Sequence, residues 1–223
     1  MSKKKLLMIG AGEFAQWCYE YLTDDSDYQV VGFAVDKACI SEPSFNGLPV
    51  VPWEEAERLF APTRHHAFVA ASYTGLNTLR SRFYTQARSK GYNLASYISS
   101  GATVSPKAIL GEGALILEGT TIQPHCRIGK NICIGMGSCV CHHSEIGDHN
   151  FLSAHVVVLG QVRIADYCFF GGNSTVTDHR IIGNSCVIGA GVVVNRDLPD
   201  NSLVKMGACE VLPLDPERAR HFA

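Results

Sequence analysis

Residues 1–95 alternate between short apolar runs and longer amphipathic stretches. Three apolar runs have the length and composition of buried strands, and they lie at residues 6–9, 29–35 and 67–71. Two longer stretches favour helices, residues 14–22 and residues 76–90, where Leu79, Phe83 and Ala87 recur at helical spacing. Strands that alternate with helices predict a small α/β domain built on a parallel sheet.

From Tyr97 onward the period of the chain is six residues. With Tyr97 as the first position of a hexad, the second position is aliphatic or Phe in every hexad from Ile98 to Val194, without an insertion. A helix of period 3.6 cannot keep such a stripe on one face, and an ordinary strand has period two. A coil with three flat faces can. Three hexads make a coil of about 18 residues, and stacked coils lie ~4.8 Å apart.

Composition and charge exclude several classes of protein for this chain. Charged residues make up only 18% of the chain against 46% hydrophobic residues, so we expect part of the surface to face other protein. The net charge of -2 offers no basic excess for a nucleic acid. Nine cysteines without a C-x-x-C spacing favour reduced thiols in the cytoplasm. No run approaches the ~18 apolar residues that a membrane helix needs.

A glycine turn follows the first predicted strand. Residues 10–15 read G-x-G-x-x-A, and Asp36 ends the next predicted strand. Alone, this pattern is weak evidence for NAD. Four polar residues follow the 67–71 strand and are expected at the same end of the sheet, namely Ser72, Tyr73, Asn77 and Arg80. Arg80 is a candidate partner for a phosphate, with a solvated helix face as the alternative.

His142 is the candidate general base. It occupies the fourth position of its hexad, on a turn, and the residue 18 positions later is Gly160. A glycine stacked on a histidine leaves room for a substrate and exposes a backbone N–H that could stabilise an oxyanion. The alternatives are a surface histidine and a glycine chosen for turn geometry. The fifth position of the hexads adds a column of polar side chains, His125, His143, Gln161 and His179. The alternative is that these residues form a polar row along one corner and have no functional role.

Together these features resemble a known family. The hexads, the turn Gly10-Ala11-Gly12 and the run His142-His143-Ser144-Glu145-Ile146-Gly147 resemble the hexapeptide-repeat acyltransferases. Within them, the chain is similar to bacterial sugar-nucleotide acetyltransferases of the bacillosamine and perosamine type, also known as the sialic acid O-acetyltransferase family. The resemblance implies a Rossmann-like nucleotide-sugar-binding domain (1–95), a left-handed parallel β-helix (96–198) and a C-terminal cap (199–223).

The resemblance also implies a reaction. An acetyl group passes from acetyl-CoA to an amino group of a nucleotide-linked sugar, with His142 as general base and the Gly160 amide as oxyanion donor. The residue after the base is often acidic in relatives, whereas here it is His143, which could still exchange a hydrogen bond with His142. The acceptor would bind at the glycine turn and sheet end, with Gly10, Gly12, Glu13, Phe14, Asp36, Ser72, Tyr73, Asn77 and Arg80.

The acyl carrier would lie in a groove between two β-helices of a homotrimer. The resemblance assigns to it Gly160, Gly172, Ala190, Gly191 and Gly207, although the relatives' Gly-x-Pro-Ala pattern lacks its proline here. Two alternatives remain, a sugar O-acetyltransferase of the same fold and a non-catalytic nucleotide-binding trimer. No metal is expected, because the H-x4-H pair of the zinc-dependent carbonic anhydrase class of this fold does not occur.

Overall fold

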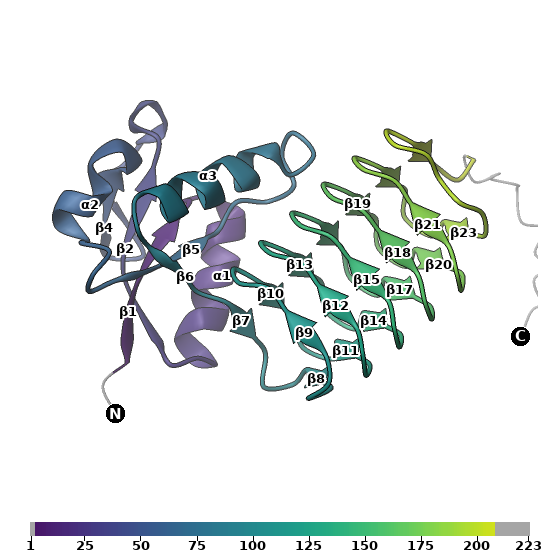
Figure 1. The fold of residues 1–223 in the computed structure, drawn as a ribbon. Coiled ribbons are helices and arrows are strands. Elements are labelled where there is room, and N and C mark those ends of the chain that lie inside the picture. Colours follow the sequence, from purple (N-terminus) through teal and green to yellow (C-terminus); the bar gives the residue numbers. More distant parts are fainter. Residues whose placement is uncertain (1–2, 208–223) are drawn as a thin grey trace, which may run out of the picture.

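The computed structural model describes residues 3–207 and has two parts, an α/β domain and a parallel β-helix (Figure 1). The first part is a six-stranded sheet with the order β3-β4-β2-β1-β5-β6, in which only β3 runs antiparallel to its neighbour. The strands are β1 (Lys4–Ile9), β2 (Tyr28–Val35), β3 (Ser44–Phe45), β4 (Leu48–Pro52), β5 (His66–Val69) and β6 (Asn93–Leu94). The predicted fold class is confirmed.

Helices cover this sheet, and both predicted helices are present. They are α1 (Glu13–Asp24), α2 (Ala56–Leu59) and α3 (Thr78–Ser89), with short 3-10 helices η1 (Lys37–Cys39) and η2 (Trp53–Glu55). The turn before α1 requires glycine, because Gly10 has a φ of +127° and a Cβ there would lie 2.5 Å from the Ala70 oxygen. Within residues 3–207, no helix has the length and apolar character needed to cross a membrane.

The β-helix has three flat faces of two-residue strands. The first face holds β7 (Tyr97–Ile98), β10 (Leu115–Ile116), β13 (Cys133–Ile134), β16 (Phe151–Leu152), β19 (Phe169–Phe170), β22 (Val187–Ile188) and β24 (Leu203–Val204). The second holds β8 (Thr103–Val104), β11 (Thr121–Ile122), β14 (Cys139–Val140), β17 (Val157–Val158), β20 (Thr175–Val176) and β23 (Val193–Val194). The third holds β9 (Ile109–Leu110), β12 (Arg127–Ile128), β15 (Glu145–Ile146), β18 (Arg163–Ile164) and β21 (Ile181–Ile182).

The six-residue period produces this shape as predicted. From β9 to β23 each strand pairs in parallel with the strand 18 residues away, as Glu145 does with Arg163. The second positions of the hexads fill the axis, and from Ile116 to Val194 none is more than 4% exposed. Ile98 is 43% exposed, because it belongs to the first coil, which no coil covers from below.

The corners explain the residues at the fifth position. Residues there adopt positive φ angles, including 59° at His143, 66° at His125 and 61° at His179. This left-handed conformation disfavours bulky and β-branched residues and is tolerated best by Gly, Asn, Asp and His. The histidine column therefore has a conformational cause that is independent of chemistry.

The stack of coils continues into the segment that we predicted as a cap. Leu198 bridges to Ile182, and β24 pairs with β22 on the first face. Residues 208–223 of the predicted cap lie outside the described residues.

The α/β domain packs on the first face of the β-helix. Aromatic side chains of α1 meet this face, with ring centroids 6.1 Å apart for Phe14 and Phe151 and 5.6 Å apart for Tyr21 and Tyr97. Asp25, just after α1, accepts hydrogen bonds from Tyr97 Oη at 2.9 Å and from the Ser100 amide at 2.8 Å. These contacts hold the two parts of the chain together.

Arg80 belongs to this junction, and our prediction of a phosphate-binding role is corrected. Its side chain is only 3% exposed, and it donates to the carbonyl oxygens of Asn131, His149 and Asn150 on the β-helix and to Asn77 Oδ1. Asn77 is fully buried and donates to the Cys168 carbonyl at 3.2 Å, so it too lies away from solvent. Burial lowers the pKa of Arg80 to about 10, which leaves it charged at neutral pH.

We expect Arg80→Met to lower the free energy of unfolding by roughly 3 to 5 kcal/mol, because it leaves buried carbonyl groups without a donor. Arg82, on the same helix, pairs with Asp36 near the surface, so Arg82→Met should cost less than about 1 kcal/mol. Chemical denaturation of both variants measures the difference. Equal losses would contradict the role assigned to Arg80.

Candidate active site

A cavity of about 690 Å³ lies where β1, β2 and β5 end. Seven residues predicted for the nucleotide pocket line it, namely Gly10, Gly12, Glu13, Phe14, Asp36, Ser72 and Tyr73. Its walls also include residues that we did not predict, among them Trp17, Cys39, Leu79 and Phe83. The carboxyl ends of parallel strands are the usual ligand site of open α/β sheets. The cavity therefore has the position and size of a nucleotide site.

Arg82 binds Asp36, one of the residues that line this cavity. Its guanidinium binds Asp36 in a bidentate pair, with Nη1–Oδ1 at 3.0 Å and Nη2–Oδ2 at 2.5 Å. The guanidinium also lies 4.2 Å from the centroid of the Phe83 ring. Asp36 thus lines the cavity as half of an ion pair. Its cationic partner is Arg82, two residues after Arg80 on α3.

Tyr73 connects the cavity to the first face of the β-helix. Its ring is half exposed and lies 4.7 Å from the ring of Phe169 and 5.1 Å from that of Phe151, centroid to centroid. The mouth of the cavity is therefore at the junction of the two parts of the chain.

His142 lies on the corner between the second and third faces, where its side chain is exposed. Gly160 stacks on it, as the 18-residue register predicts, because a Cβ on Gly160 would be 2.8 Å from His142 Cε1 and 3.1 Å from Nε2. The His142 amide donates to Gln123 Oε1 at 2.9 Å. The edge of the imidazole that carries Nε2 therefore lies against Gly160, and a side chain at position 160 would push it away.

The Gly160 amide has a partner within the chain. It donates a hydrogen bond to Asp178 Oδ1 at 2.9 Å. Asp178 stands one coil beyond Gly160 at the same corner, and its side chain is exposed. The 18-residue spacing that joins His142 to Gly160 also reaches residue 178, so the sequence holds a signal for this contact. The N–H that we predicted as an oxyanion donor is thus bonded to a carboxylate here.

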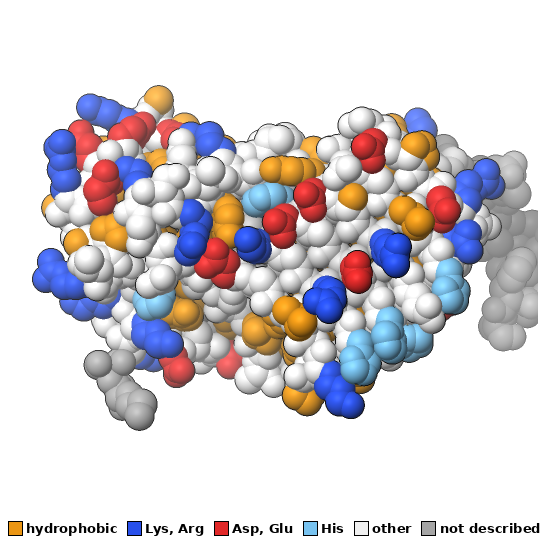
Figure 2. All heavy atoms as spheres, in the orientation of Figure 1, with side chains coloured by type: hydrophobic (Ala, Val, Ile, Leu, Met, Phe, Trp, Pro, Cys, Tyr) orange, Lys and Arg blue, Asp and Glu red, His pale blue; other side chains and the backbone are white. Residues whose placement is uncertain are grey.

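His143 contacts the candidate base directly. Its Nδ1 lies 3.3 Å from Nδ1 of His142, so one of these nitrogens can donate to the other. The His143 ring stacks on that of His125, with centroids 4.8 Å apart and planes 27° apart. This contact leaves Nε2 of His142 turned toward Gly160. Figure 2 shows histidine side chains gathered along one edge of the β-helix.

Cys141, next to His142, remains a thiol at neutral pH. Burial, followed by the neighbouring Cys139, raises the pKa of Cys141 to about 11, and the two sulfur atoms are 3.7 Å apart. Only the thiolate is an effective nucleophile, so a covalent acyl-cysteine step at neutral pH is disfavoured here. Among residues 3–207 there is no group of three or more His, Cys, Asp or Glu side chains arranged to hold a metal ion.

The cavity and His142 lie on different sides of the β-helix within one chain. The α/β domain covers the first face and, through Arg80, the corner between the third and first faces. His142 lies on the corner between the second and third faces, which is the corner opposite the first face. Three residues predicted for the acyl carrier, Gly172, Ala190 and Gly191, lie on the corner between the first and second faces, and the exposed Gly207 lies beyond β24. One chain does not bring these groups together.

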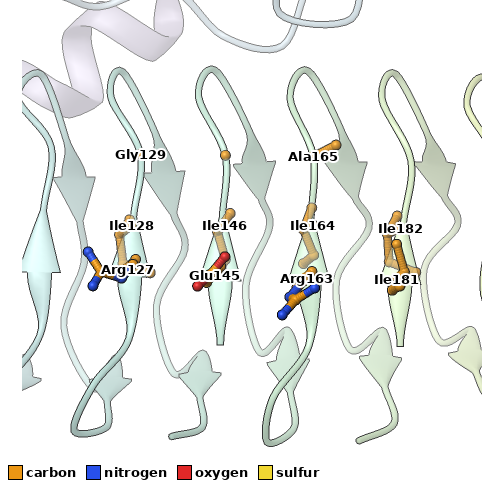
Figure 3. A pocket seen from close by; sticks show the side chains of 11 residues that line it. Arg127, Ile128, Gly129, Glu145, Ile146, Arg163, Ile164, Ala165, Ile181 and Ile182 are labelled. Carbon is orange, nitrogen blue, oxygen red and sulfur yellow. The ribbon is translucent and has the colours of Figure 1, made fainter. Parts of the chain in front are cut away.

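The third face carries a smaller hollow of about 380 Å³. Arg127, Glu145, Arg163 and Ile181 follow one another along this face, beside Gly129 and Ala165 (Figure 3). None of the predicted site residues lines it.

Comparison with known proteins supports the repeat. Residues 143–178 match the family described as bacterial transferase hexapeptide (six repeats), a segment that begins directly after His142. Among curated protein sequences, none is significantly similar to this chain.

Solved structures share the whole fold. The acetyltransferase domain of PglB from Neisseria gonorrhoeae, in complex with acetyl coenzyme A, superposes with a TM-score of 0.80 at 24% identity and covers 90% of this chain and 95% of its own. WeeI from Acinetobacter baumannii has a TM-score of 0.76 at 20% identity, with coverages of 89% and 94%.

A third structure is more similar in sequence. A histidine variant of perosamine N-acetyltransferase from Caulobacter crescentus, in complex with CoA and GDP-perosamine, has a TM-score of 0.75 at 29% identity and covers 89% of this chain and 92% of its own. These findings confirm the predicted resemblance: the chain carries the hexapeptide repeat of bacterial transferases on a fold that it shares with acetyltransferases, among them a perosamine N-acetyltransferase.

Proposed function

We propose that this protein transfers an acetyl group from acetyl-CoA to an amino group of a nucleotide-linked sugar. The observation that carries the proposal is the exposed His142, whose Nε2 edge lies against Gly160, on a chain that also has a nucleotide-sized cavity. The Caulobacter enzyme, which was crystallised with CoA and GDP-perosamine, supports the same pair of substrates.

In this proposal His142 acts as a general base. Its Nδ1 exchanges a hydrogen bond with His143, which keeps the ring oriented and leaves the lone pair of Nε2 for the proton of the acceptor. His143 is a positioning residue, because it acts through His142. It replaces the acidic residue frequent in relatives and supplies a hydrogen bond without a negative charge.

The Gly160 amide serves as oxyanion donor once it changes partner. In the structure it donates to Asp178 Oδ1, and the thioester oxygen takes that place when acetyl-CoA enters. Asp178 is exposed, so its carboxylate can move off the amide and stay at this corner without disturbing the core. A donor placed where negative charge develops on the thioester oxygen lowers the barrier to acyl transfer.

The acceptor binds in the cavity of the α/β domain. The glycine turn 10–12 precedes α1, so backbone N–H groups at the start of this helix face the space where a diphosphate would lie. Phe14 and Tyr73 offer aromatic surface, and the Asp36–Arg82 pair offers both an acceptor and donors for the nucleoside.

The site is completed between two copies of the chain, and we propose the homotrimer of the family. Support comes from the position of the cavity and His142 on different sides of one β-helix, and from the second face. The outward positions of its strands are Thr103, Thr121, Cys139, Val157, Thr175 and Val193, none of which is charged. An uncharged flat face suits burial against another copy. Gly172, Ala190 and Gly191 border this face and remain proposed acyl-carrier contacts.

Two other functions stay open to test. O-acetylation of a sugar could use the same base, and a nucleotide-binding trimer without catalysis would need no reactive histidine. The cytoplasmic location remains a prediction from the reduced cysteines and from the proposed substrates.

A thiol-release assay with acetyl-CoA and a panel of nucleotide amino sugars tests the proposal. We expect CoA release that depends on one amino sugar nucleotide, with an amide product identified by mass spectrometry. Release only with hydroxyl acceptors would support O-acetylation, and no release with any acceptor, despite nucleotide binding, would support the non-catalytic alternative.

Replacing the base should remove most of the rate. We expect His142→Ala to lower kcat by roughly 10²- to 10⁴-fold, the usual contribution of a positioned base, with little change in the binding of either substrate. His179→Asn is the matched control, because Asn tolerates the left-handed backbone at this corner. A His142→Ala rate within threefold of wild type would place the base elsewhere.

Asp36 should matter for the acceptor alone. We expect Asp36→Ala to weaken acceptor binding by about 1.5 to 3 kcal/mol, the scale of a lost charge-assisted hydrogen bond, and to leave acetyl-CoA binding unchanged. Calorimetry with each ligand measures both effects. Arg82→Ala serves as a control that frees the carboxylate. If both variants bind the acceptor as wild type does, the ion pair has no part in the site.

A further inference from the structure

Asp178 is a carboxylate beside the proposed base with no cationic partner among the described residues. Its Oδ1 accepts the Gly160 amide at 2.9 Å, and a Cβ built on Gly160 would lie 3.2 Å from the same oxygen and 3.1 Å from His142 Nε2. The proposed base and a carboxylate oxygen thus both lie beside Gly160. The nearest arginine in sequence, Arg180, pairs with Asp197 instead, at 3.8 Å.

The charge of Asp178 is not needed for its structural contact. At the corner between the third and first faces, side chains at the same hexad position also accept the amide one coil earlier. Asp166 Oδ1 accepts from the Asp148 amide at 2.7 Å, and Asn184 Oδ1 accepts from the Asp166 amide at 3.1 Å. A neutral Asn therefore serves this ladder as Asp does. The hydrogen bond from the Gly160 amide therefore does not require a negative charge at residue 178.

We propose that Asp178 is a specificity-determining residue that selects an amine over a hydroxyl as acyl acceptor. The inference rests on the proposed function and deepens it. When the thioester oxygen takes the Gly160 amide, the carboxylate loses its only side-chain hydrogen bond within residues 3–207. An acceptor amine that enters between His142 and Asp178 restores a partner to it.

The chemistry of the two acceptors explains the selection. As the amine nitrogen bonds to the thioester carbon, the carbonyl electron pair moves to oxygen and the nitrogen becomes cationic. Asp178 stabilises this cation until His142 Nε2 takes its proton; the C–S bond then breaks, the electron pair leaves with sulfur, and the imidazolium returns the proton to give the CoA thiol. A hydroxyl gives up its proton to the base as it attacks, so its oxygen gains no lasting positive charge. A nearby carboxylate therefore gives it no advantage.

The charge-removing variant Asp178→Asn tests this directly, because the amide can still accept from Gly160. The probes are the nucleotide amino sugar that wild type turns over best and the nucleotide sugar with a hydroxyl at the same carbon, the latter as substrate or competitive inhibitor. We expect kcat/KM for the amine to fall roughly 10- to 100-fold, as for a lost hydrogen bond between charged groups. The kcat/KM or Ki of the hydroxyl compound and the KM of acetyl-CoA should stay within threefold.

Asp166→Asn is the matched control, since it makes the same change in the ladder on a corner away from His142, and it should leave both acceptors unaffected. Equal losses for amine and hydroxyl, or no loss for the amine, would overturn the inference while acetyl transfer by the wild type stands. Turnover of hydroxyl acceptors only would overturn it together with the N-acetyl assignment. Absence of any wild-type transfer would overturn the proposed function itself.

Discussion

The 18-residue register between successive coils is the constraint on which the rest of the structure depends. From β7 to β23, backbone hydrogen bonds join strands that are 18 residues apart, and neighbouring coils lie ~4.8 Å apart. This register places Gly160 over His142 and Asp178 over Gly160, so three residues far apart in the sequence form one column. A single inserted residue would turn the aliphatic stripe away from the axis, which is why the hexads run without interruption.

A second constraint is the junction that holds the α/β domain on the first face. Arg80 is buried there with carbonyl oxygens as partners, an arrangement that is costly to disturb and that sets where the cavity can open. The α/β domain packs on the first face of the β-helix, whereas His142 lies on the corner between the second and third faces. A ligand in the cavity therefore does not contact His142 of the same chain. The proposed chemistry consequently requires a second copy, and the uncharged second face is available to it.

Much of this could be predicted from the sequence, because strong periodicity depends only on local residue types. The hexads, the strands at 6–9 and 29–35 and the stacking of Gly160 on His142 follow from spacing alone. The strands β3 and β4, at one end of the sheet, have no such signal, since β3 has only two residues and β4 contains Pro49 and Pro52. Arg80 was misassigned although a signal existed: residues 80, 84 and 87 lie on one helical stripe, whereas Arg82 faces the other way. Side-chain pairs such as Asp36–Arg82 depend on packing that spacing does not encode.

Subunit complementation tests most directly whether the site forms between copies. His142→Ala lacks the base and keeps the cavity, while a variant with bulky side chains in the cavity, such as Gly12→Trp, lacks the acceptor site and keeps the base. Both should be inactive alone. Mixed and reassembled as trimers in equal amounts, they should regain about a quarter of the wild-type activity, because a quarter of the interfaces then pair an intact cavity with an intact base. Mixed trimers, verified by mass spectrometry, that remain inactive would contradict the account.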